Sequence, residues 1–321
     1  MTERHKAILS IITCVLFWGF SFISIKTAVA VFPPMTLGLF RFVLALFFLF
    51  FIKHRLAPGE RLRLRDIPLL CGAGLSGVTL YFFCENNGVA LVTVSEASII
   101  TGAIPVLVMA AEWAEGRLSR TRPGLISPSR TSPPPIHRDR IGGRRWIGAA
   151  VSVAGVWMVA GVSLAVSGSR SGYLYMGGAA LSWTAYCFLT RPLFTRCSRI
   201  HIVFWQSVFG AAGFLPFAIA EQGRRGTPDL PVILHILFLG ICCSALGYWF
   251  YAKSLQALGL GVTAVFLNFI PVVTVIGGFF LLGERLTALQ WAGALLVLGG
   301  AYLATSTGPS HGSKPSADYR D

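Results

Sequence analysis

The sequence predicts an all-α integral membrane protein with ten transmembrane helices, arranged as two inverted five-helix repeats. Three observations lead to this prediction: an apolar composition, ten apolar runs of membrane-spanning length, and an internal duplication. Of the 321 residues, 54% are hydrophobic and only 12% are charged, whereas charged residues make up about 25% of an ordinary soluble domain. With a mean hydropathy of +0.68, the chain has the composition of a polytopic membrane protein.

Ten apolar runs are long enough to cross about 30 Å of hydrocarbon, which takes about 20 helical residues. The predicted spans cover 7–25, 35–52, 67–84, 91–111, 146–166, 172–190, 201–220, 232–251, 262–282 and 288–305. The first run follows Arg4-His5-Lys6 and resembles a secretory signal, but its apolar part is longer than the roughly 7 to 15 residues of a signal. We therefore expect it to remain as the first span.

The second half of the chain repeats the first at a nearly constant offset. Five pairs lie 165 to 167 positions apart: Trp18 and Trp183, Arg41 and Gln206, Tyr81 and Tyr248, Ala90 and Ala257, and Pro105 and Pro271. Because five spans per copy is an odd number, the second copy enters the membrane from the opposite side, which gives an inverted repeat. We predict a first repeat over 1–166 and a second over 172–305.

Lysine and arginine are distributed unequally between the two sides of this arrangement. If the N-terminus is cytoplasmic, 21 of the 27 lie in cytoplasmic segments and five outside, with Arg41 within a span. The positive-inside rule then predicts a multi-pass protein of the cell (inner) membrane with both termini in the cytoplasm. The net charge of +14 does not indicate a nucleic acid partner, because the basic residues lie between apolar runs.

The first copy carries about 21 residues that the second lacks. They fall within 117–145, a Pro-, Ser- and Arg-rich stretch for which we predict a disordered basic insertion. A regulatory or lipid-binding cytoplasmic loop and a local reading-frame error in the gene both explain this insertion. The polar tail 306–321 is predicted to be disordered and cytoplasmic.

Several short motifs occur along the chain. They are Trp18-Gly19-Phe-Ser-Phe with Lys26, Pro33-Pro34, Arg41-Phe42, Tyr81-Phe-Phe-Cys-Glu85-Asn86, Ala97-Ser-Ile-Ile with Pro105, Trp183 with Tyr186, and Gly283-Glu-Arg-Leu286 before Trp291-x-Gly-Ala. Together they resemble the EamA family of the drug/metabolite transporter (DMT) superfamily over roughly 7–110 and 144–305. The resemblance implies a ten-helix carrier, often an exporter of amino acids or other small metabolites, with a central cavity between the repeats and no nucleotide-binding domain.

Polar and aromatic side chains within spans are the candidate solute contacts. A charged side chain at mid-helix costs about 2.5–3.5 kcal/mol on insertion scales, so it is expected to face the protein interior or a water-filled cavity. The predicted substrate-binding residues are Trp18, Arg41, Glu85, Asn86, Trp183, Tyr186, Gln206, Tyr248, Tyr251 and Asn268. Structural roles are the alternative for each: anchoring, core packing, or hydrogen bonding between helices.

Two prolines occupy matching places in the two copies. Pro105 and Pro271 each lie within an apolar run, where a proline removes a backbone hydrogen bond and breaks or bends the helix. Paired breaks in the two halves of an inverted repeat indicate a binding site near the middle of the membrane. We expect both helices to bend there during alternating access.

These features predict a secondary transporter of small organic solutes, such as amino acids, metabolites or drugs, that works as an exporter by alternating access. The chain has no G-x-x-x-x-G-K-[ST] loop, so we expect no cofactor, and a proton carried by Glu85 or Glu96 is the candidate coupling ion. The expected partners are the solute and the lipid bilayer.

Two other functions remain as alternatives. A membrane-embedded enzyme acting on lipid-linked substrates needs a nucleophile, an acid/base pair or a metal cluster. The six histidines lie apart with no H-x-x-x-H, and the predicted spans contain no aspartate, so no catalytic or metal site is predicted. A non-transporting receptor or scaffold would not require an inverted repeat.

Overall fold

The computed structural model describes residues 3–121, 143–167, 169–224 and 226–305, and within these ranges the chain is helical, with no β-strand. The first half contains α1 (Glu3–Val29), α2 (Pro34–Leu56), η1 (Leu64–Asp66), α3 (Ile67–Gly74), η2 (Leu75–Leu80), α4 (Tyr81–Leu91), α5 (Val94–Thr101), α6 (Ile104–Thr121) and α7 (Gly143–Ser167). The second half contains α8 (Arg170–Thr190), η3 (Arg191–Thr195), α9 (Arg199–Ala220), η4 (Gln222–Arg224), α10 (Leu230–Leu237), η5 (Phe238–Leu246), α11 (Gly247–Leu267), α12 (Ile270–Leu282) and α13 (Ala288–Thr305). The all-α prediction is confirmed for the described residues.

Six helical stretches of the described residues are long and apolar enough to cross a membrane. They are Arg4–Val29, Pro34–Leu56, Leu64–Leu91, Val94–Glu115, Arg199–Ala220 and Leu230–Ser254. Three shorter apolar helices are Trp146–Val159, Ile270–Leu282 and Ala288–Leu303. α8 has the length of a span, but its tyrosines, glycines, Ser182 and Thr184 make it less apolar. Length and composition thus support six spans, and the ten-span arrangement stays a prediction.

The two segments predicted to be disordered lie largely outside the described residues. Of the insertion at 117–145, residues 117–121 complete α6 and residues 143–145 begin α7. Both ends of that stretch are therefore helical, because each continues an adjoining helix. Residues 122–142 and the tail 306–321 lie outside the described part of the chain.

Local sequence sets the ends of α2. Pro34 occupies the first turn, where backbone N–H groups have no acceptor within the helix, so the N–H that proline lacks is not needed. Lys53, His54 and Arg55 fill the last turn, where positive charge interacts favourably with the helix dipole. Between these ends the helix is almost wholly apolar, and Arg41 is the charged residue near its middle.

Two of the six long stretches contain π-helical turns. η2 interrupts the Leu64–Leu91 stretch, and η5 interrupts Leu230–Ser254. A π-helical turn holds one residue more than an α-helical turn and occurs often at functional sites. Both segments therefore mark places where a candidate membrane span departs from regular helix geometry.

Two helices are broken just before a proline. α5 ends at Thr101 and α6 begins at Ile104, so that Pro105 is its second residue; α11 ends at Leu267 and α12 begins at Ile270, with Pro271 second. Proline is accommodated there because the N–H groups of the first turn have no intrahelical acceptor. Both prolines thus start a new helix after a short break.

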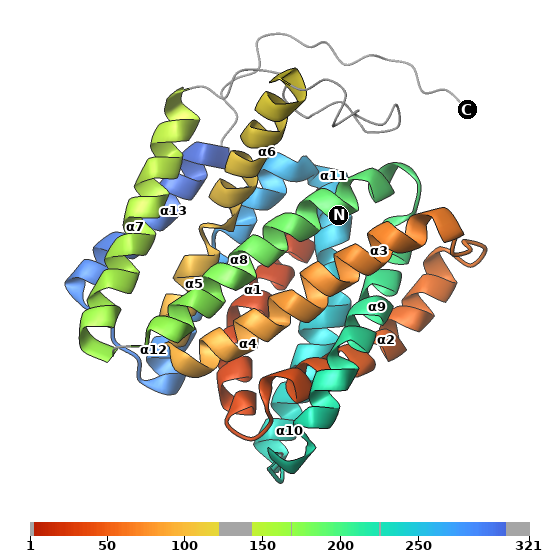
Figure 1. Ribbon diagram of the computed structural model, residues 1–321, viewed down its shortest axis with the longest axis horizontal. Helices are drawn as coiled ribbons and strands as arrows, with labels where there is room; N and C mark the ends of the chain where they lie inside the picture. Colours follow the sequence, from red (N-terminus) through yellow and green to blue (C-terminus); the bar gives the residue numbers. More distant parts are fainter. Residues whose placement is uncertain (1–2, 122–142, 168, 225, 306–321) are drawn as a thin grey trace.

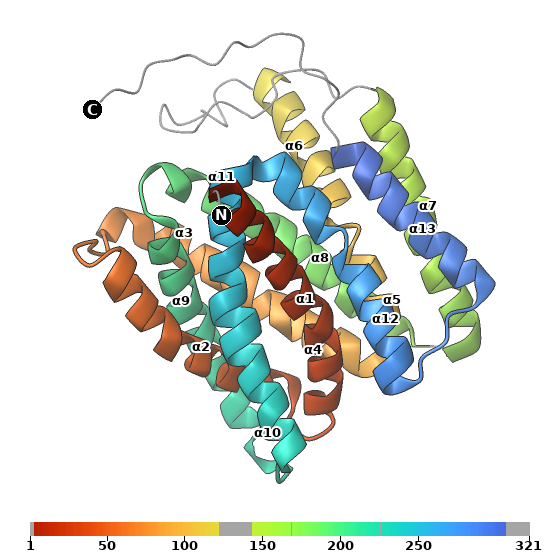
Figure 2. The same cartoon turned by 180° about the vertical axis from the view of Figure 1, so that it is seen from behind.

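α7 and α13 lie side by side at one edge of the molecule in both views (Figures 1 and 2). Small residues line their contact. A Cβ added at Gly155 would lie 2.6 Å from the Gly293 carbonyl oxygen, and one at Gly300 would lie 2.4 Å from the Ser152 nitrogen. Glycine lets the two backbones approach closely, which is how helices associate in lipid, where apolar side chains gain little from leaving the solvent.

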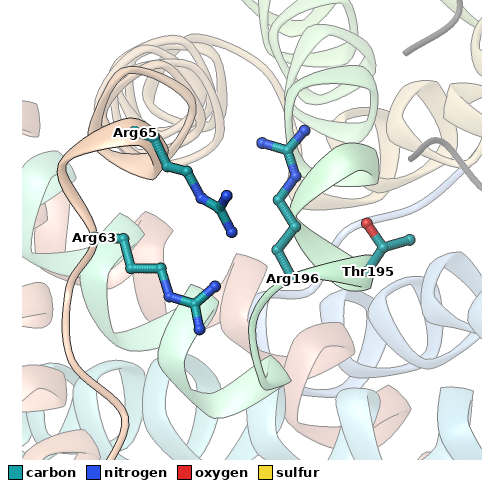
Figure 3. A pocket seen from close by; sticks show the side chains of 4 residues that line it. All are labelled: Arg63, Arg65, Thr195 and Arg196. Atoms are coloured by element: carbon teal, nitrogen blue, oxygen red, sulfur yellow. The ribbon is translucent and has the colours of Figure 1, made fainter. Parts of the chain in front are cut away.

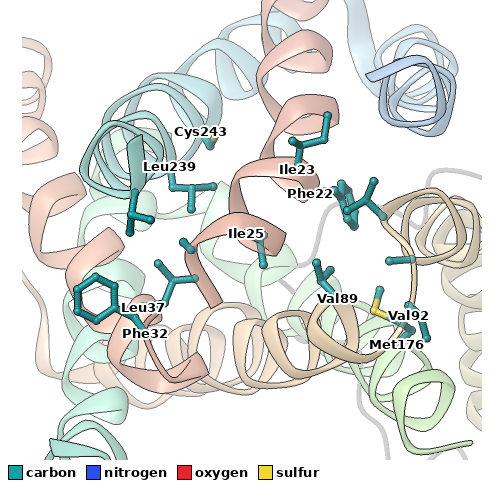
Figure 4. Close-up of a cluster of buried hydrophobic side chains, with 14 of the residues drawn as sticks. Phe22, Ile23, Ile25, Phe32, Leu37, Val89, Val92, Met176, Leu239 and Cys243 are labelled. Carbon is teal, nitrogen blue, oxygen red and sulfur yellow. The ribbon is translucent and has the colours of Figure 1, made fainter. Parts of the chain in front are cut away.

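α1 is packed inside the bundle. One cluster of buried side chains joins its face to α2, α4, α8 and η5 through Ile25, Leu37, Val89, Met176 and Leu239 (Figure 4). Ile25 and Leu37 are completely buried. Side chains that interdigitate in this way fix the relative position of the helices that carry the polar residues described below.

Contacts between helices occur in matched pairs that relate the two halves of the chain. α1 packs against α11, and α8 packs against α4; α2 contacts η5, and α9 contacts η2. α2 also packs against α9, as α7 does against α13.

Large apolar side chains cover much of the outer surface. Phe47, Phe50 and Phe51 of α2 and Phe280 of α12 are exposed, Phe280 to 77%. A water-soluble monomer rarely exposes continuous apolar area of this kind. These surfaces suit contact with lipid chains.

Candidate functional site

Arg41 of α2 is the charged centre of the candidate site. Its side chain is 3% exposed, and its Nε donates a hydrogen bond to Ser244 Oγ of η5 at 2.5 Å. The guanidinium carbon lies 4.2 Å from the centroid of the Phe82 ring, a distance at which a cation and a ring attract each other. Nη1 is buried and has no hydrogen-bond partner. Arg41 therefore keeps one donor available inside the protein.

Glu85 of α4 provides a carboxylate within the influence of the Arg41 charge. It is 4% exposed, and its Oε1 accepts a hydrogen bond of 2.8 Å from the Tyr81 hydroxyl. Tyr81 and Glu85 are four residues apart on one helix, so their side chains lie on the same face. The buried carboxylate is thus oriented by its own helix.

Aromatic rings from α1, α4, α8 and α11 gather next to this pair. The Trp18 ring centroid lies 5.5 Å from that of Tyr248 and 5.6 Å from that of Tyr251. Trp183 lies 5.1 Å from Tyr81, 5.0 Å from Tyr186 and 6.5 Å from Tyr248. Such spacing is typical of tilted and edge-to-face aromatic contacts. We call these rings, with Arg41 and Glu85, the central cluster.

The π-helical segment η5 contributes two groups to the central cluster. Ser244 accepts the bond from Arg41, and the Cys243 carbonyl accepts a 3.0 Å hydrogen bond from Trp18 Nε1. The wide π turn therefore holds both the arginine of α2 and the tryptophan of α1.

Of the ten predicted contacts, the structure brings seven into the central cluster: Trp18, Arg41, Glu85, Trp183, Tyr186, Tyr248 and Tyr251. Gln206 of α9 is 1% exposed and lies close enough to act on the Tyr186 hydroxyl, so it borders the cluster. Asn86 and Asn268 lie elsewhere. Asn86 Nδ2 donates to the Pro34 carbonyl at the start of α2 (2.9 Å), and Asn268 lies in the break between α11 and α12.

Glu96, the other residue considered as a proton carrier, has a structural role. It forms a capping box with Thr93 at the start of α5, and its Oε1 accepts a 3.0 Å hydrogen bond from Gln290 Nε2. Thr93-Val-Ser-Glu96 is the sequence signature of such a box. Both oxygens of this carboxylate therefore have a donor.

A second group of side chains lies near the start of α9. Its members are Glu60, Cys197 and His201, whose potential metal-ligand atoms lie within 4.8 Å of one another. Metal binding is disfavoured there. Both Glu60 oxygens accept hydrogen bonds from Ser198, and Lys53 and Arg63 lie close enough to act on His201. Burial raises the pKa of the Cys197 thiol, which opposes the thiolate that a metal requires.

Sequence reasoning missed three contacts of the central cluster: Tyr81, Phe82 and Ser244. Tyr81 had a signal, since it lies four residues before Glu85. Phe82 adjoins Tyr81 but had no signal of its own. Ser244 lies 203 residues from Arg41, and a serine in an apolar run gives no indication of its partner.

Glutamates at two connections cap helices of the other half. Glu284, in the Gly283-Glu-Arg-Leu286 motif, accepts hydrogen bonds from Val94 N, Ser95 N and Ser95 Oγ at 2.9, 3.1 and 2.7 Å, at the start of α5. Glu221 accepts hydrogen bonds from Thr36 N and Thr36 Oγ1 at 2.7 and 2.9 Å, at the start of α2. The motif thus supports the fold outside the central cluster.

Lys26 has a complementary structural role. Its ammonium group donates to the carbonyls of Val89, Ala90 and Val92 at 2.8, 3.1 and 2.8 Å, at the end of α4. A cation there satisfies carbonyls that have no partner within the helix.

The sequence matches the model of the EamA-like transporter family over residues 5–116 and 170–306. An uncharacterized transporter of Archaeoglobus fulgidus is 28% identical, over 90% of this chain and 95% of that protein. A probable amino-acid metabolite efflux pump of Salmonella typhimurium is 24% identical, over 94% and 95%. A probable terminal-alkyne amino-acid exporter of Streptantibioticus cattleyicolor is 22% identical, over 94% of each chain.

A protein of known crystal structure has the same fold. It superposes with a TM-score of 0.62 at 18% identity and covers 94% of this chain and 97% of its own. The family match extends over both halves of the chain and confirms the resemblance drawn from the motifs. This chain therefore belongs to the EamA-like transporter family, within the drug/metabolite transporter superfamily, and is a multi-pass membrane transporter of small solutes.

Proposed function

We propose that this chain is a secondary exporter of amino acids or closely related metabolites. It works by alternating access between two inverted five-helix repeats, residues 1–166 and 172–305, in the cell membrane with both termini in the cytoplasm. The observation that carries the proposal is the central cluster, where an unpaired guanidinium nitrogen, a carboxylate and aromatic faces meet inside the bundle.

Helix contacts support the inverted repeat, because a contact made by a helix of the first half has a counterpart made by the corresponding helix of the second half. α1 corresponds to α8, and the packing of α1 on α11 is matched by that of α8 on α4. The contacts of α2 with η5 and of α9 with η2 form a second matched pair. The π-helical segments lie in corresponding predicted spans, as do the breaks before Pro105 and Pro271. A two-fold relation within the membrane plane gives this pattern.

The central cluster suits an amino-acid zwitterion. A buried donor without a partner costs about 1–3 kcal/mol, and a solute carboxylate would satisfy Arg41 Nη1 with a charge-assisted hydrogen bond. Glu85 offers a carboxylate to an ammonium group. The rings of Trp18, Trp183 and Tyr248 offer apolar and π surface to the solute side chain.

The names of two relatives support the solute class and the direction. One is a probable amino-acid metabolite efflux pump, and the other a probable terminal-alkyne amino-acid exporter. Both align with 94% of this chain.

A proton gradient is the proposed driving force, with Glu85 as the residue that carries the proton. Glu85 is buried beside a basic group and accepts a hydrogen bond from Tyr81 through one oxygen. Gain or loss of a proton at Glu85 would change the net charge around Arg41 and so link the solute site to the proton gradient.

The test is metabolite profiling of medium and cells that overproduce the chain, beside Arg41→Gln, Glu85→Gln and Trp18→Ala. We expect one or more amino acids to accumulate outside only with the intact protein, and each variant to lower export at least tenfold. Glu112→Gln and Trp157→Ala are matched controls, because both side chains are exposed. The amount of each variant in the membrane is measured in parallel.

Counterflow in proteoliposomes then separates the steps. Glu85→Gln should abolish uptake driven by a proton gradient but only weaken exchange of labelled solute across the membrane, because Arg41 and the aromatic rings still contact the solute. Export unchanged in Arg41→Gln and Glu85→Gln, at normal protein levels, would remove the central cluster as the solute site.

A further inference from the structure

A basic cavity lies on the molecule away from the central cluster. It has a volume of about 620 Å³ and is lined by Arg63, Arg65, Thr195 and Arg196. Figure 3 shows the three arginines reaching from two separate segments toward a common space. One segment connects α2 to α3, and the other is the end of η3 and the residue after it. We call this the arginine cavity.

A buried carboxylate holds part of the arginine cavity in place. Asp66 is 1% exposed, and its oxygens lie 3.5 Å from Arg196 Nη1 and 3.9 Å from Arg65 Nε. Among the described residues, the carboxylate within 4.0 Å of these arginines is that of Asp66, which carries one negative charge against three positive ones. The remaining excess of positive charge favours an anion in the cavity, and planar guanidinium groups match the oxygens of a phosphate especially well.

Two exposed apolar residues are sequence neighbours of the residues that line the arginine cavity. Leu64, between two of the arginines, is 84% exposed, and Phe194, next to Thr195, is 46% exposed. A soluble anion gains nothing from these two side chains. A phospholipid does, because its phosphate meets basic groups at the level where apolar side chains enter the acyl region.

We propose that the arginine cavity binds a phosphate group, and that its source is the head group of an anionic phospholipid. Leu64 and Phe194 then contact the acyl chains of the same lipid. Both segments lie in predicted cytoplasmic connections, where anionic lipids give the leaflet a negative surface potential. The bound phosphate joins the two segments, one from each half of the chain. The site is independent of the solute path, so it stands or fails separately from the proposed export.

The test uses the purified full chain in a neutral detergent. Its thermal unfolding midpoint is followed while phosphatidylglycerol, phosphatidylcholine or inorganic phosphate is added, since a ligand of the folded state raises the midpoint. We expect phosphatidylglycerol to stabilise far more than phosphatidylcholine. Arg63→Gln/Arg65→Gln should weaken the apparent affinity about thirtyfold, roughly fivefold for each basic residue. Arg61→Gln, an exposed arginine of the same connection outside the cavity lining, is the control.

Two further variants distinguish the sources of the phosphate. Leu64→Gln and Phe194→Gln should weaken phosphatidylglycerol binding and leave any effect of inorganic phosphate unchanged. If inorganic phosphate stabilises as well as the lipid and these variants have no effect, a soluble phosphate is the ligand and the lipid source is wrong.

Equal affinity of the intact chain and the double arginine variant for phosphatidylglycerol would overturn the site itself. If the double variant does not fold, each single variant should still show about a fivefold loss. Added salt should also weaken lipid binding to the intact chain, because screening acts on exposed charges.

Discussion

A short motif occurs once in each half of the chain, as Glu115-Gly-Arg-Leu118 and as Gly283-Glu-Arg-Leu286, yet its two glutamates form different contacts. Glu284, after α12, folds back and accepts three hydrogen bonds from the start of α5. Glu115 stays within α6 and forms a surface ion pair with Arg191 at 3.5 Å, beside a closer pair between Arg191 and Glu112. The one carboxylate fixes a helix of the other half, and the other lies on the surface, 45% exposed.

The order of two residues accounts for this difference. In the second half glycine precedes glutamate, and Gly283 ends α12 in the left-handed conformation with φ of 68°. That turn directs Glu284 toward α5. In the first half glutamate precedes glycine, Glu115-Gly116, and α6 continues to Thr121. A shared motif therefore does not guarantee a shared contact, because the turn decides where the carboxylate points.

The largest effect is expected for Glu284→Ala. It leaves two backbone N–H groups and one hydroxyl of α5 without their acceptor, and hydrogen bonds to a charged group contribute about 1.5–3 kcal/mol. We expect a loss of about 3 kcal/mol in the free energy of unfolding, measured in mixed micelles. Arg285→Ala, at the exposed neighbouring position, is the control. A loss below that of the control would show that the cap is not stabilising.

Glu221→Ala tests whether the capping arrangement is general. Glu221 also accepts from the first turn of a helix in the other half, but its third contact, from Met35 N, is long at 3.4 Å. We therefore expect a smaller loss of about 2 kcal/mol. Unfolding of the two single variants and the double variant, followed in the same micelles, should give additive losses, since the two caps share no residue. Strong coupling between them would contradict this.

Gly283→Ala isolates the contribution of the turn. A Cβ at this position would meet no atom within 4 Å, so the cost comes only from the left-handed backbone. We expect a loss of about 1 kcal/mol. Gly283→Asn should restore part of the stability, because asparagine tolerates this conformation better than alanine. Equal stability of all three proteins would mean that the turn is not what positions Glu284.

Glu115→Ala should have the smallest effect, about 0.5 kcal/mol, because exposed ion pairs contribute little. A double-mutant cycle of Glu115→Ala with Arg191→Ala measures the pair directly. The coupling should decrease further as salt is added. A coupling as large as the effect of Glu284→Ala would remove the contrast between the two motifs.

Much of the central cluster could be predicted from the sequence. Trp18, Trp183 and Tyr248 stand at duplicated positions, and a charge at Arg41 or Glu85 is costly in lipid unless the protein surrounds it. These arguments need only one helix at a time. The all-α class and the family followed in the same way from composition and the order of motifs.

Other features depend on contacts between distant segments. The partner of Arg41 is Ser244, whose place is set by the π turn of η5. Asn86, predicted at the solute site, instead donates to the Pro34 carbonyl, because the end of α4 reaches the start of α2. No spacing along the chain reveals these pairs. Glu96 is different: it is predicted as a candidate proton carrier, although the capping-box signature that explains its structural role is present in the sequence.

The π-helical segments have a consequence for how the chain tolerates length changes. A π turn accommodates one extra residue within an otherwise continuous helix. Removing a single residue from η2 or η5 would shorten the wide turn toward α-helix, and the residues beyond would keep nearly the same rotation relative to those before, because the π turn absorbs the extra residue. The same deletion from a regular α-helix would rotate the residues beyond it by about 100°. Tyr81 and Glu85 follow η2, and Tyr248 and Tyr251 follow η5. Each π segment thus lets a helix that contributes to the central cluster lose one residue while those side chains still face the same neighbours, which a deletion elsewhere in the same helix would not allow.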